Sequence, residues 1–174
     1  RQWGERYAFG SYRHDPQPVD ADDILSHEDA WVTPGIKTYA QKHVPQALSS
    51  ALDIIPCLAD AELVYSMGGM FSFTPDGFPI LGESPRVKGF WSAEAVWITH
   101  AGGVGKAVAE WIVDGIPSLD MHECDISRFH AHAQGRDYVR TRSSRQYREV
   151  YDIAHPLKQV AVPRGLRLSQ FHRR

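Results

Sequence analysis

A glycine-rich loop between a buried strand and an amphipathic helix, within residues 68–116, most constrains how this chain of 174 residues can fold. Residues 90–98 are apolar at nearly every position, which is typical of a strand covered on both faces. The sequence HAGGVGK of residues 100–106 leads into a helical apolar stripe formed by Val104, Ala107, Val108, Trp111 and Ile112. Gly115 is placed to end this helix. A strand, a glycine loop and a helix in this order present backbone N–H groups to a negatively charged ligand.

The sequence of this loop matches two nucleotide-binding motifs in part, but it lacks required residues of both. A Walker A motif requires Gly at position 100 and Ser or Thr at position 107, where this chain has His100 and Ala107. A dinucleotide-binding G-x-G-x-x-G motif that begins at Gly103 requires Gly at position 108, which is Val108. Two interpretations remain: the N–H groups and dipole of the helix start attract negative charge, or the glycines only allow close packing of helix and strand.

Hydrophobic periodicity and turn residues predict an α/β chain, or an α+β fragment. We expect strands near 6–12, 62–73 and 89–98, and helices near 39–55, 102–114 and 137–152. Gly68-Gly69 should interrupt the second strand as a bulge or tight crossing. The sequence Thr74-Pro75-Asp76-Gly77 has the residue preferences of a β-turn.

The charge of the chain is unevenly distributed. Residues 1–127 hold 8 Lys and Arg against 18 Asp and Glu, and residues 128–174 hold 11 against 3, so the balances are −10 and +8. A basic segment can bind nucleic acid. Because this one lacks the aromatic pattern of an RNA-binding sheet, we expect instead that the two halves neutralise each other in a larger protein and that nucleic acid is no partner.

Cysteine, histidine and hydropathy patterns restrict the other classes of site. Cys57 lies in the apolar run IIPCLA, which predicts a buried side chain. The clusters at 122–125 and 130–132 do not have zinc-site spacing, so no metal is expected. No apolar run approaches the roughly 18 residues that span a bilayer, and no membrane partner is expected. Since the chain opens on Arg1 without an initiator Met, we expect a fragment or an excised domain.

Several segments of the sequence are similar to one known family. The segments TPDGFPILGES and AEAVWITHAGGVGKAVAEW resemble the C-terminal, FAD-contacting part of amine-oxidising flavoproteins of the D-amino-acid-oxidase type. Among these proteins, the chain looks most similar to the dimethylglycine oxidase, dimethylglycine dehydrogenase and sarcosine dehydrogenase family. The resemblance continues through ECDISRF, YVRTRSSRQYREVYDIAHPL and PRGLRLSQFH, and so covers essentially the whole chain.

The resemblance implies a domain organisation. Residues 1–73 would belong to the substrate-binding sheet domain, residues 74–117 would return to the FAD-binding domain, and residues 118–174 would connect to an aminomethyltransferase-like domain. The chain would then be the C-terminal part of a two-domain FAD-binding and substrate-binding oxidase fold without its N-terminal Rossmann half. The N-terminal FAD domain and the C-terminal folate-binding domain would both be missing partners.

The resemblance also implies a cofactor site. The residues that would line the flavin or form the turn into the helix are Val96, Trp97, Ile98, Thr99, His100, Gly102 and Gly103. Fixed N–H donors at this helix start would stabilise the negative charge of a reduced flavin. Asp76 would form the turn and would not act as a base. No catalytic residue is assigned; a functional role of Tyr12 or His14 stays an alternative to packing of a sheet over the flavin.

By resemblance, the parent protein oxidatively demethylates dimethylglycine or sarcosine with FAD and passes the one-carbon unit to water or to tetrahydrofolate. Its location would be the cytoplasm in a bacterium and the mitochondrial matrix in a eukaryote. This chain alone should be inactive. Two alternatives remain open: a non-catalytic binding module that uses the basic C-terminal segment, and a flavoprotein relative with another substrate or without activity.

Overall fold

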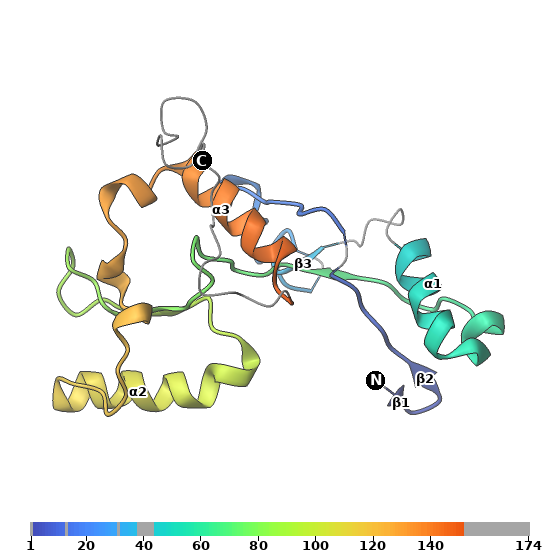
Figure 1. The fold of residues 1–174 in the computed structure, drawn as a ribbon, viewed down its shortest axis with the longest axis horizontal. Coiled ribbons are helices and arrows are strands. Elements are labelled where there is room, and N and C mark those ends of the chain that lie inside the picture. The colour runs from blue at the N-terminus through green and yellow to red at the C-terminus, as the bar shows by residue number, and fades with distance from the viewer. Residues whose placement is uncertain (1, 13, 31, 38–43, 152–174) are drawn as a thin grey trace, which may run out of the picture.

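The computed structural model describes residues 2–12, 14–30, 32–37 and 44–151 (Figure 1). Within these residues, the strands form short antiparallel pairs: β1 (Gln2–Trp3) with β2 (Arg6–Tyr7), β3 (Ile36–Lys37) with β4 (Gly68–Gly69), and β5 (Ile80–Glu83) with β6 (Trp91–Glu94). The α-helices are α1 (Val44–Ile54), α2 (Ala101–Asp114) and α3 (Arg136–Arg148). Six short 3-10 turns complete the described elements: Ala21–Asp23, Pro56–Asp60, Ile98–His100, His122–Cys124, Ile126–Arg128 and Ala131–Ala133.

The predicted helices are present, whereas the predicted strands are much shorter than expected. Helix α1 ends one residue before the end of the range predicted as 39–55, of which residues 39–43 lie outside the described residues. Helix α3 ends at Arg148, whereas the prediction was 137–152, of which residue 152 lies outside the described residues. Of the strand expected at 62–73, only Gly68–Gly69 is extended and paired, where an interruption was predicted. A strand needs a neighbouring backbone for its N–H and C=O groups. Within the described part of the chain, these segments meet only short partners.

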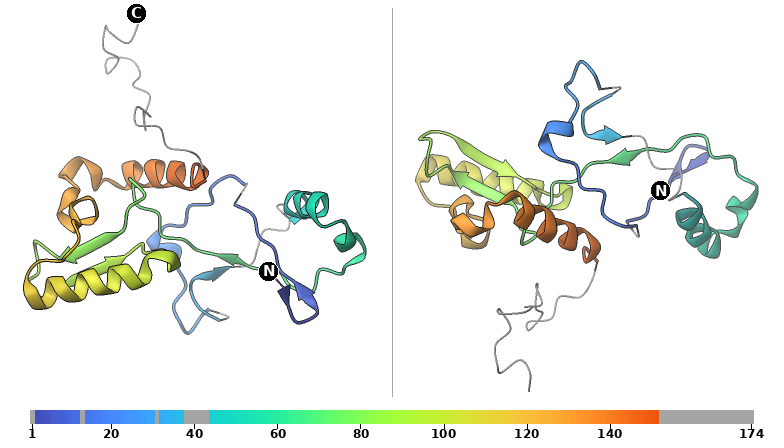
Figure 2. Two further views of the ribbon diagram at one scale, coloured as in Figure 1. Left: turned by 60° about the horizontal axis from the view of Figure 1, so that its bottom comes forward. Right: turned by 90° about the horizontal axis from the view of Figure 1, so that it is seen from above.

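The β5–β6 hairpin packs against α2 on one side, and the segment that carries α3 lies on its other side (Figures 1 and 2). Leu81 in β5 is fully buried, and Val104 and Ala107 are the buried residues of α2. The rings of Trp91 and Trp111 meet edge to face with centroids 5.9 Å apart. The apolar stripe predicted for this helix is therefore confirmed at its N-terminal end and in part at Trp111, which is half-buried.

Two glycines with positive φ shape this region: Gly82 lies against Trp111, and Gly115 ends α2. Gly82 has a φ of +112°, which L side chains rarely adopt, and a Cβ on it would lie 3.1 Å from Cη2 of Trp111, so a side chain here would be strained and would press on the Trp111 ring. Gly115 adopts the left-handed conformation with a φ of 80°, and its N–H donates to the carbonyl oxygen of Trp111 at 3.1 Å. It ends α2 as the sequence predicts.

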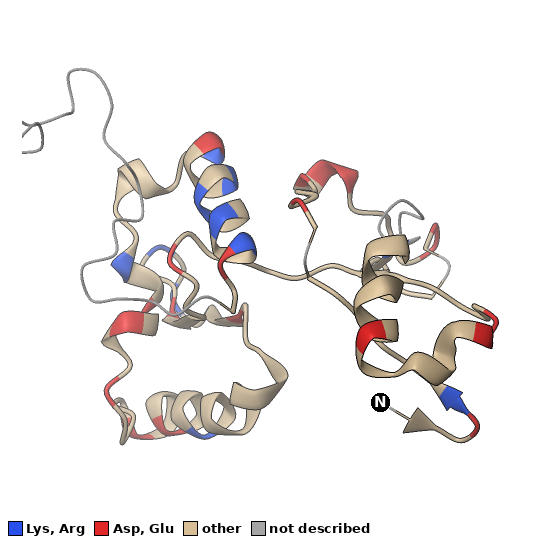
Figure 3. Ribbon diagram, turned by 45° about the vertical axis from the view of Figure 1, so that its right-hand side comes forward, with Lys and Arg blue, Asp and Glu red and all other residues tan. Residues whose placement is uncertain are grey.

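Charged side chains from the two ends of the sequence pair with each other within the chain. Arg140 Nη1 lies 2.9 Å from Asp20, and the ion pairs Arg136–Asp22 and Arg148–Asp15 measure 3.5 Å each. The basic residues of α3 are visible in Figure 3. Part of the predicted neutralisation of acidic and basic segments therefore takes place inside this chain.

Much apolar surface of the described residues stays uncovered. Ile98 is 95% exposed, Val113 is 80% exposed and Phe90 is 56% exposed. In the stretch expected to be a strand covered on both faces, Ser92 of β6 is buried, whereas Phe90 and Ile98 at its two ends are exposed. Cys57, predicted to be buried, is exposed in the turn Pro56–Asp60, so this prediction was wrong. No helix in the described ranges is both long and apolar enough to cross a bilayer.

Candidate flavin-side loop

The segment from the end of β6 into the first turn of α2, residues 95–103, carries all seven predicted site residues. Ala95 has a positive φ of 55°, which is uncommon outside glycine and turns the chain sharply after β6. The 3-10 turn Ile98–His100 follows, and α2 begins at Ala101. The predicted helix start is confirmed to within one residue. Gly102 and Gly103 were expected in a turn that precedes the helix; they lie in the first turn of α2, and Ile98–His100 makes that turn instead.

The start of α2 is open. A Cβ added to Gly102, Gly103 or Gly105 would meet no described atom within 4 Å. The interpretation that these glycines allow close packing of helix and strand therefore finds no support in the described residues. The side chain of His100 at the N-cap position makes no capping hydrogen bond. The N–H of Ala101 donates to the Ile98 carbonyl. The N–H groups that follow it in the first turn belong to those that an α-helix cannot pair internally, and they can face an anionic group.

Trp97, one of the predicted site residues, packs into a group of rings that we call the aromatic cluster. Its ring centroid lies 5.6 Å from Phe71 and 5.8 Å from Phe73. Phe73 in turn lies 5.6 Å from Tyr147, edge to face. The aromatic cluster consists of Tyr12, His14, Phe71, Phe73, Trp97, Tyr147 and Tyr151. Trp97 is thereby held at the edge of the loop, next to the open helix start.

Tyr12 does not lie in a strand, contrary to the sequence-based expectation of a strand over 6–12, and neither Tyr12 nor His14 pairs with another described strand. They pack instead against the C-terminal end of α3. His14 Nε2 is hydrogen-bonded to the Tyr147 hydroxyl at 2.7 Å. Partial burial raises the pKa of Tyr12, and the neighbouring Tyr151 raises it further.

The turn at residues 74–77 is stabilised by its own polar groups and by an arginine from a distant segment. Gly77 N–H donates to Thr74 Oγ1 at 3.0 Å, and Asp76 Oδ1 accepts from the Phe78 N–H at 3.2 Å. Asp76 therefore acts as a turn former, as expected. Its Oδ2 also accepts from Arg128 Nε at 2.8 Å. The sequence gives no signal for this ion pair, because a turn aspartate and an arginine 52 positions later share no local pattern.

The Asp76–Arg128 pair makes the stability of the fold dependent on pH. Partial burial acts to raise the pKa of the Asp76 carboxyl, but hydrogen bonds from Arg128, Phe78 N–H and Thr74, together with the guanidinium charge, hold that pKa below its ordinary value of 3.8. The carboxylate thus stabilises the folded state above pH 3.8, and this contribution is lost as the pH falls through the lower folded pKa.

We expect the melting temperature of Asp76→Asn to lie below that of the wild type at neutral pH. The difference should shrink as the pH is lowered through and below 3.8, because the wild-type carboxylate then becomes protonated as well. Thermal unfolding followed by circular dichroism over this range measures both variants. A difference that stays constant with pH would show that the charge of Asp76 does not contribute.

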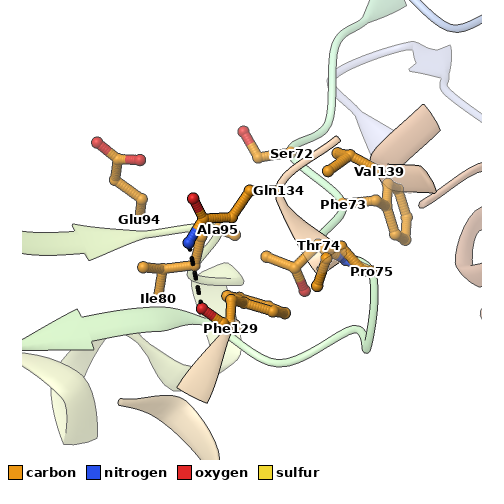
Figure 4. A pocket seen from close by; sticks show the side chains of 11 residues that line it. Ser72, Phe73, Thr74, Pro75, Ile80, Glu94, Ala95, Phe129, Gln134 and Val139 are labelled. Carbon is orange, nitrogen blue, oxygen red and sulfur yellow. Dashed lines mark hydrogen bonds between the residues drawn. The ribbon is translucent and has the colours of Figure 1, made fainter. Parts of the chain in front are cut away.

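A pocket of about 300 Å³ opens beside the turn (Figure 4). It lies between the hairpin, Ala95 and the segment before α3, and Gln134 Nε2 at its wall donates to the Phe129 carbonyl at 3.2 Å. None of the seven predicted site residues lines it; Phe73 of the aromatic cluster and Ala95 do. The full lining is Ser72, Phe73, Thr74, Pro75, Ile80, Glu94, Ala95, Phe129, Ala133, Gln134 and Val139.

The histidine clusters noted in the sequence are exposed pairs. His122 Nδ1 lies 2.9 Å from Asp120 Oδ1, and this hydrogen bond and the aspartate charge raise the pKa of His122. The rings of His130 and His132 stack with centroids 6.3 Å apart. Within the described ranges, no group of three or more His, Cys, Asp or Glu side chains is arranged to hold a metal ion.

The start of α2 lies open after a hairpin and an aromatic side chain. Comparison with known families identifies the family of the chain. Residues 1–111 match the family model described as FAD dependent oxidoreductase, and residues 114–169 match the FAD dependent oxidoreductase central domain. The chain belongs to the FAD dependent oxidoreductase family, and the resemblance to amine-oxidising flavoproteins is confirmed.

Three curated relatives show the range of this family. The chain is 31% identical to the mitochondrial sarcosine dehydrogenase of Homo sapiens over 73% of its own length and 14% of the relative. It is 29% identical to the mitochondrial dimethylglycine dehydrogenase of Homo sapiens over 64% of the chain and 14% of the relative. It is also 29% identical to the mitochondrial pyruvate dehydrogenase phosphatase regulatory subunit of Mus musculus, over 100% of the chain and 20% of the relative. The chain thus spans between 14% and 20% of the length of these relatives.

Proposed function

We propose that this chain is part of an FAD-dependent enzyme that oxidatively demethylates a small N-methyl amino acid, either dimethylglycine or sarcosine. The observation that supports this most is the open, glycine-rich start of α2, one 3-10 turn after Trp97, in a chain of the FAD dependent oxidoreductase family. The names of two relatives, sarcosine dehydrogenase and dimethylglycine dehydrogenase, support the substrate class.

The residues of the loop fit a flavin. In this proposal Val96, Trp97, Ile98 and Thr99 line the ring system, and His100, Gly102 and Gly103 bring the helix start toward its pyrimidine side. Bound FAD supplies the acceptor for a hydride equivalent from the N-methyl carbon. The chain's own contribution is electrostatic: N–H groups fixed at the helix start face the negative charge that reduction produces, and they need no reorganisation to stabilise it. The free space at both glycines supports close approach of a ring to this backbone.

The domain organisation is proposed as the resemblance implies it. Residues 1–73 belong to the substrate side, residues 74–117 to the FAD side, and residues 118–174 to a connecting segment. The Rossmann half for the ADP part of FAD and a folate-binding domain lie elsewhere in the parent protein, with tetrahydrofolate as a second acceptor of the one-carbon unit. In a eukaryote, the mitochondrial names of the relatives support a location in the matrix.

A second candidate function is that of a regulatory protein that has this fold but does not catalyse the oxidation. The relative named pyruvate dehydrogenase phosphatase regulatory subunit matches over the whole chain at 29% identity, so this fold is found in a protein with a regulatory name. A module that binds through its basic segment is less favoured, because three arginines of α3 already face aspartates of the chain.

The experiment uses the purified full-length protein. Its visible spectrum should show bound oxidised flavin, and anaerobic addition of sarcosine or dimethylglycine should bleach that band with release of formaldehyde. N-methyl-free glycine is the matched control and should leave the spectrum unchanged. Bound flavin that no N-methyl amino acid reduces would favour the regulatory candidate, and a protein without flavin after supply of FAD would exclude the proposed function.

A further inference from the structure

Arg128 uses every N–H group of its guanidinium. Besides the bond to Asp76 Oδ2, Nη2 donates to Asp76 Oδ1 at 3.1 Å and to the Phe78 carbonyl at 3.0 Å. Nη1 donates to the carbonyls of Cys124 and Asp125 at 2.9 Å and 3.0 Å. The guanidinium carbon lies 4.2 Å from the centroid of the Phe129 ring, and the side chain is only 12% exposed. This planar arrangement of five donors is one that lysine cannot reproduce.

These bonds connect two parts of the chain that match different family models. Asp76 and Phe78 lie in the part that matches the FAD dependent oxidoreductase model, and Arg128 lies in the part that matches the central domain. A second connection supports the first: Leu81 and Asp125 form an isolated parallel bridge, so the segment before Arg128 lies along the free edge of β5. Both connections act on the same hairpin.

The hairpin leads directly to the candidate flavin-side loop. Residue pairs Ile80–Glu94 and Leu81–Ala93 hold β5 to β6, and Ser92 Oγ donates to the Ile80 carbonyl at 3.1 Å. Ala95, with its positive φ, follows β6 immediately. The turn at Asp76 is thus connected to residues 95–103 through the paired backbones of β5 and β6.

We propose that Arg128 is a positioning residue: from the central-domain segment, it fixes the β5–β6 hairpin and thereby the loop 95–103 that faces the flavin. This inference rests on the proposed function for the placement of the flavin. In this proposal, an arginine in residues 114–169 sets the geometry of a loop in residues 1–111.

The test uses the FAD-loaded full-length protein with Arg128→Met and Arg128→Lys. Amide hydrogen exchange of residues 91–104 should become about tenfold faster in Arg128→Met, and the dissociation constant of FAD should rise about tenfold, because buried hydrogen bonds to a charged group are lost. Arg128→Lys should restore only part of either quantity. Exchange in α1 should not change.

Arg140→Met is the matched control. It also removes an arginine with two 2.9 Å bonds to one aspartate, but that pair is 45% and 36% exposed and lies outside the hairpin. Exchange at 91–104 and FAD affinity should both stay as in the wild type. If Arg128→Met does not fold, Asp76→Asn replaces it, since it keeps the size of the side chain and removes the charge, and the same local acceleration at 91–104 is expected.

The outcomes separate this inference from the proposed function. Unchanged exchange at 91–104, or equal acceleration in 91–104 and α1, would overturn the positioning role and leave the flavin placement intact. Faster exchange at 91–104 without any change in FAD affinity would overturn the connection to the flavin. A second variant, Gly103→Asp, then tests the proposed function itself. If it also changed neither the potential nor the occupancy of the flavin, the proposed flavin placement at the start of α2 would be wrong.

Discussion

Replacement of Gly103 by Asp in the full-length protein is expected to lower the midpoint potential of the flavin by roughly 20 to 40 mV, or to cause loss of the flavin. The new carboxylate would stand at a helix start that is free of capping side chains and open to its surroundings. Two unit charges about 4 Å apart repel by about 4 kcal/mol at an effective dielectric of about 20. Screening and partial charge reduce this to about 1 to 2 kcal/mol, and for two electrons about 30 mV corresponds to about 1.4 kcal/mol.

Redox titration of the visible flavin band measures this potential. Ala109→Asp is the matched control, since it places the same charge on an exposed position of α2, two turns after the helix start. His130→Ala and His132→Ala should likewise leave the potential unchanged. An unaltered potential with full flavin occupancy in Gly103→Asp would show that the start of α2 does not face the flavin.

Leu81→Ala should lower the free energy of unfolding of the full-length protein by about 2 to 5 kcal/mol. Leu81 is the largest side chain in the described ranges that is completely buried. It lies in β5, which contacts both α2 and the turn Ile126–Arg128. Because packed segments enclose it, the surroundings cannot collapse fully into the space that the missing methyl groups leave. Urea unfolding followed by tryptophan fluorescence measures the change.

Leu63→Ala removes the same atoms from a side chain that is 58% exposed, and serves as the control. Its effect should stay within about 0.5 kcal/mol, as for most surface substitutions. If Leu63→Ala and Leu81→Ala cost the same, the hairpin would not be the centre of packing in this part of the protein.

Local sequence signals predicted the elements that depend on neighbouring residues. The start and end of α2 follow from its apolar stripe and from Gly115, and the turn at Asp76 follows from Thr, Pro, Asp and Gly in succession. Strand lengths could not be predicted in this way. The alternation at residues 6–12 suits a strand, but only Arg6–Tyr7 finds a paired backbone among the described residues.

The candidate site was predictable only where it is continuous in sequence. Residues 95–103 were found from their glycines and their resemblance to a family. The partners of Trp97 were not, because Phe71 and Phe73 come from another segment and share no motif with it. Tyr12 and Tyr147, which contact these two rings, come from two further segments. The role of Arg128 could not be predicted for the same reason, because its partners Asp76 and Phe78 lie on a turn far earlier in the chain.

The pairing of α3 with the acidic segment has a consequence for how this region responds to ionic strength. Its three ion pairs are solvent-exposed, so each contributes about 0 to 1 kcal/mol at most. At physiological salt the Debye length is about 8 Å, and added salt weakens such pairs further. The apolar ring contacts of Tyr12 with Tyr147 and Tyr151 are not screened in this way. Concentrated salt should therefore loosen residues 15–22 while Tyr12 stays anchored on α3.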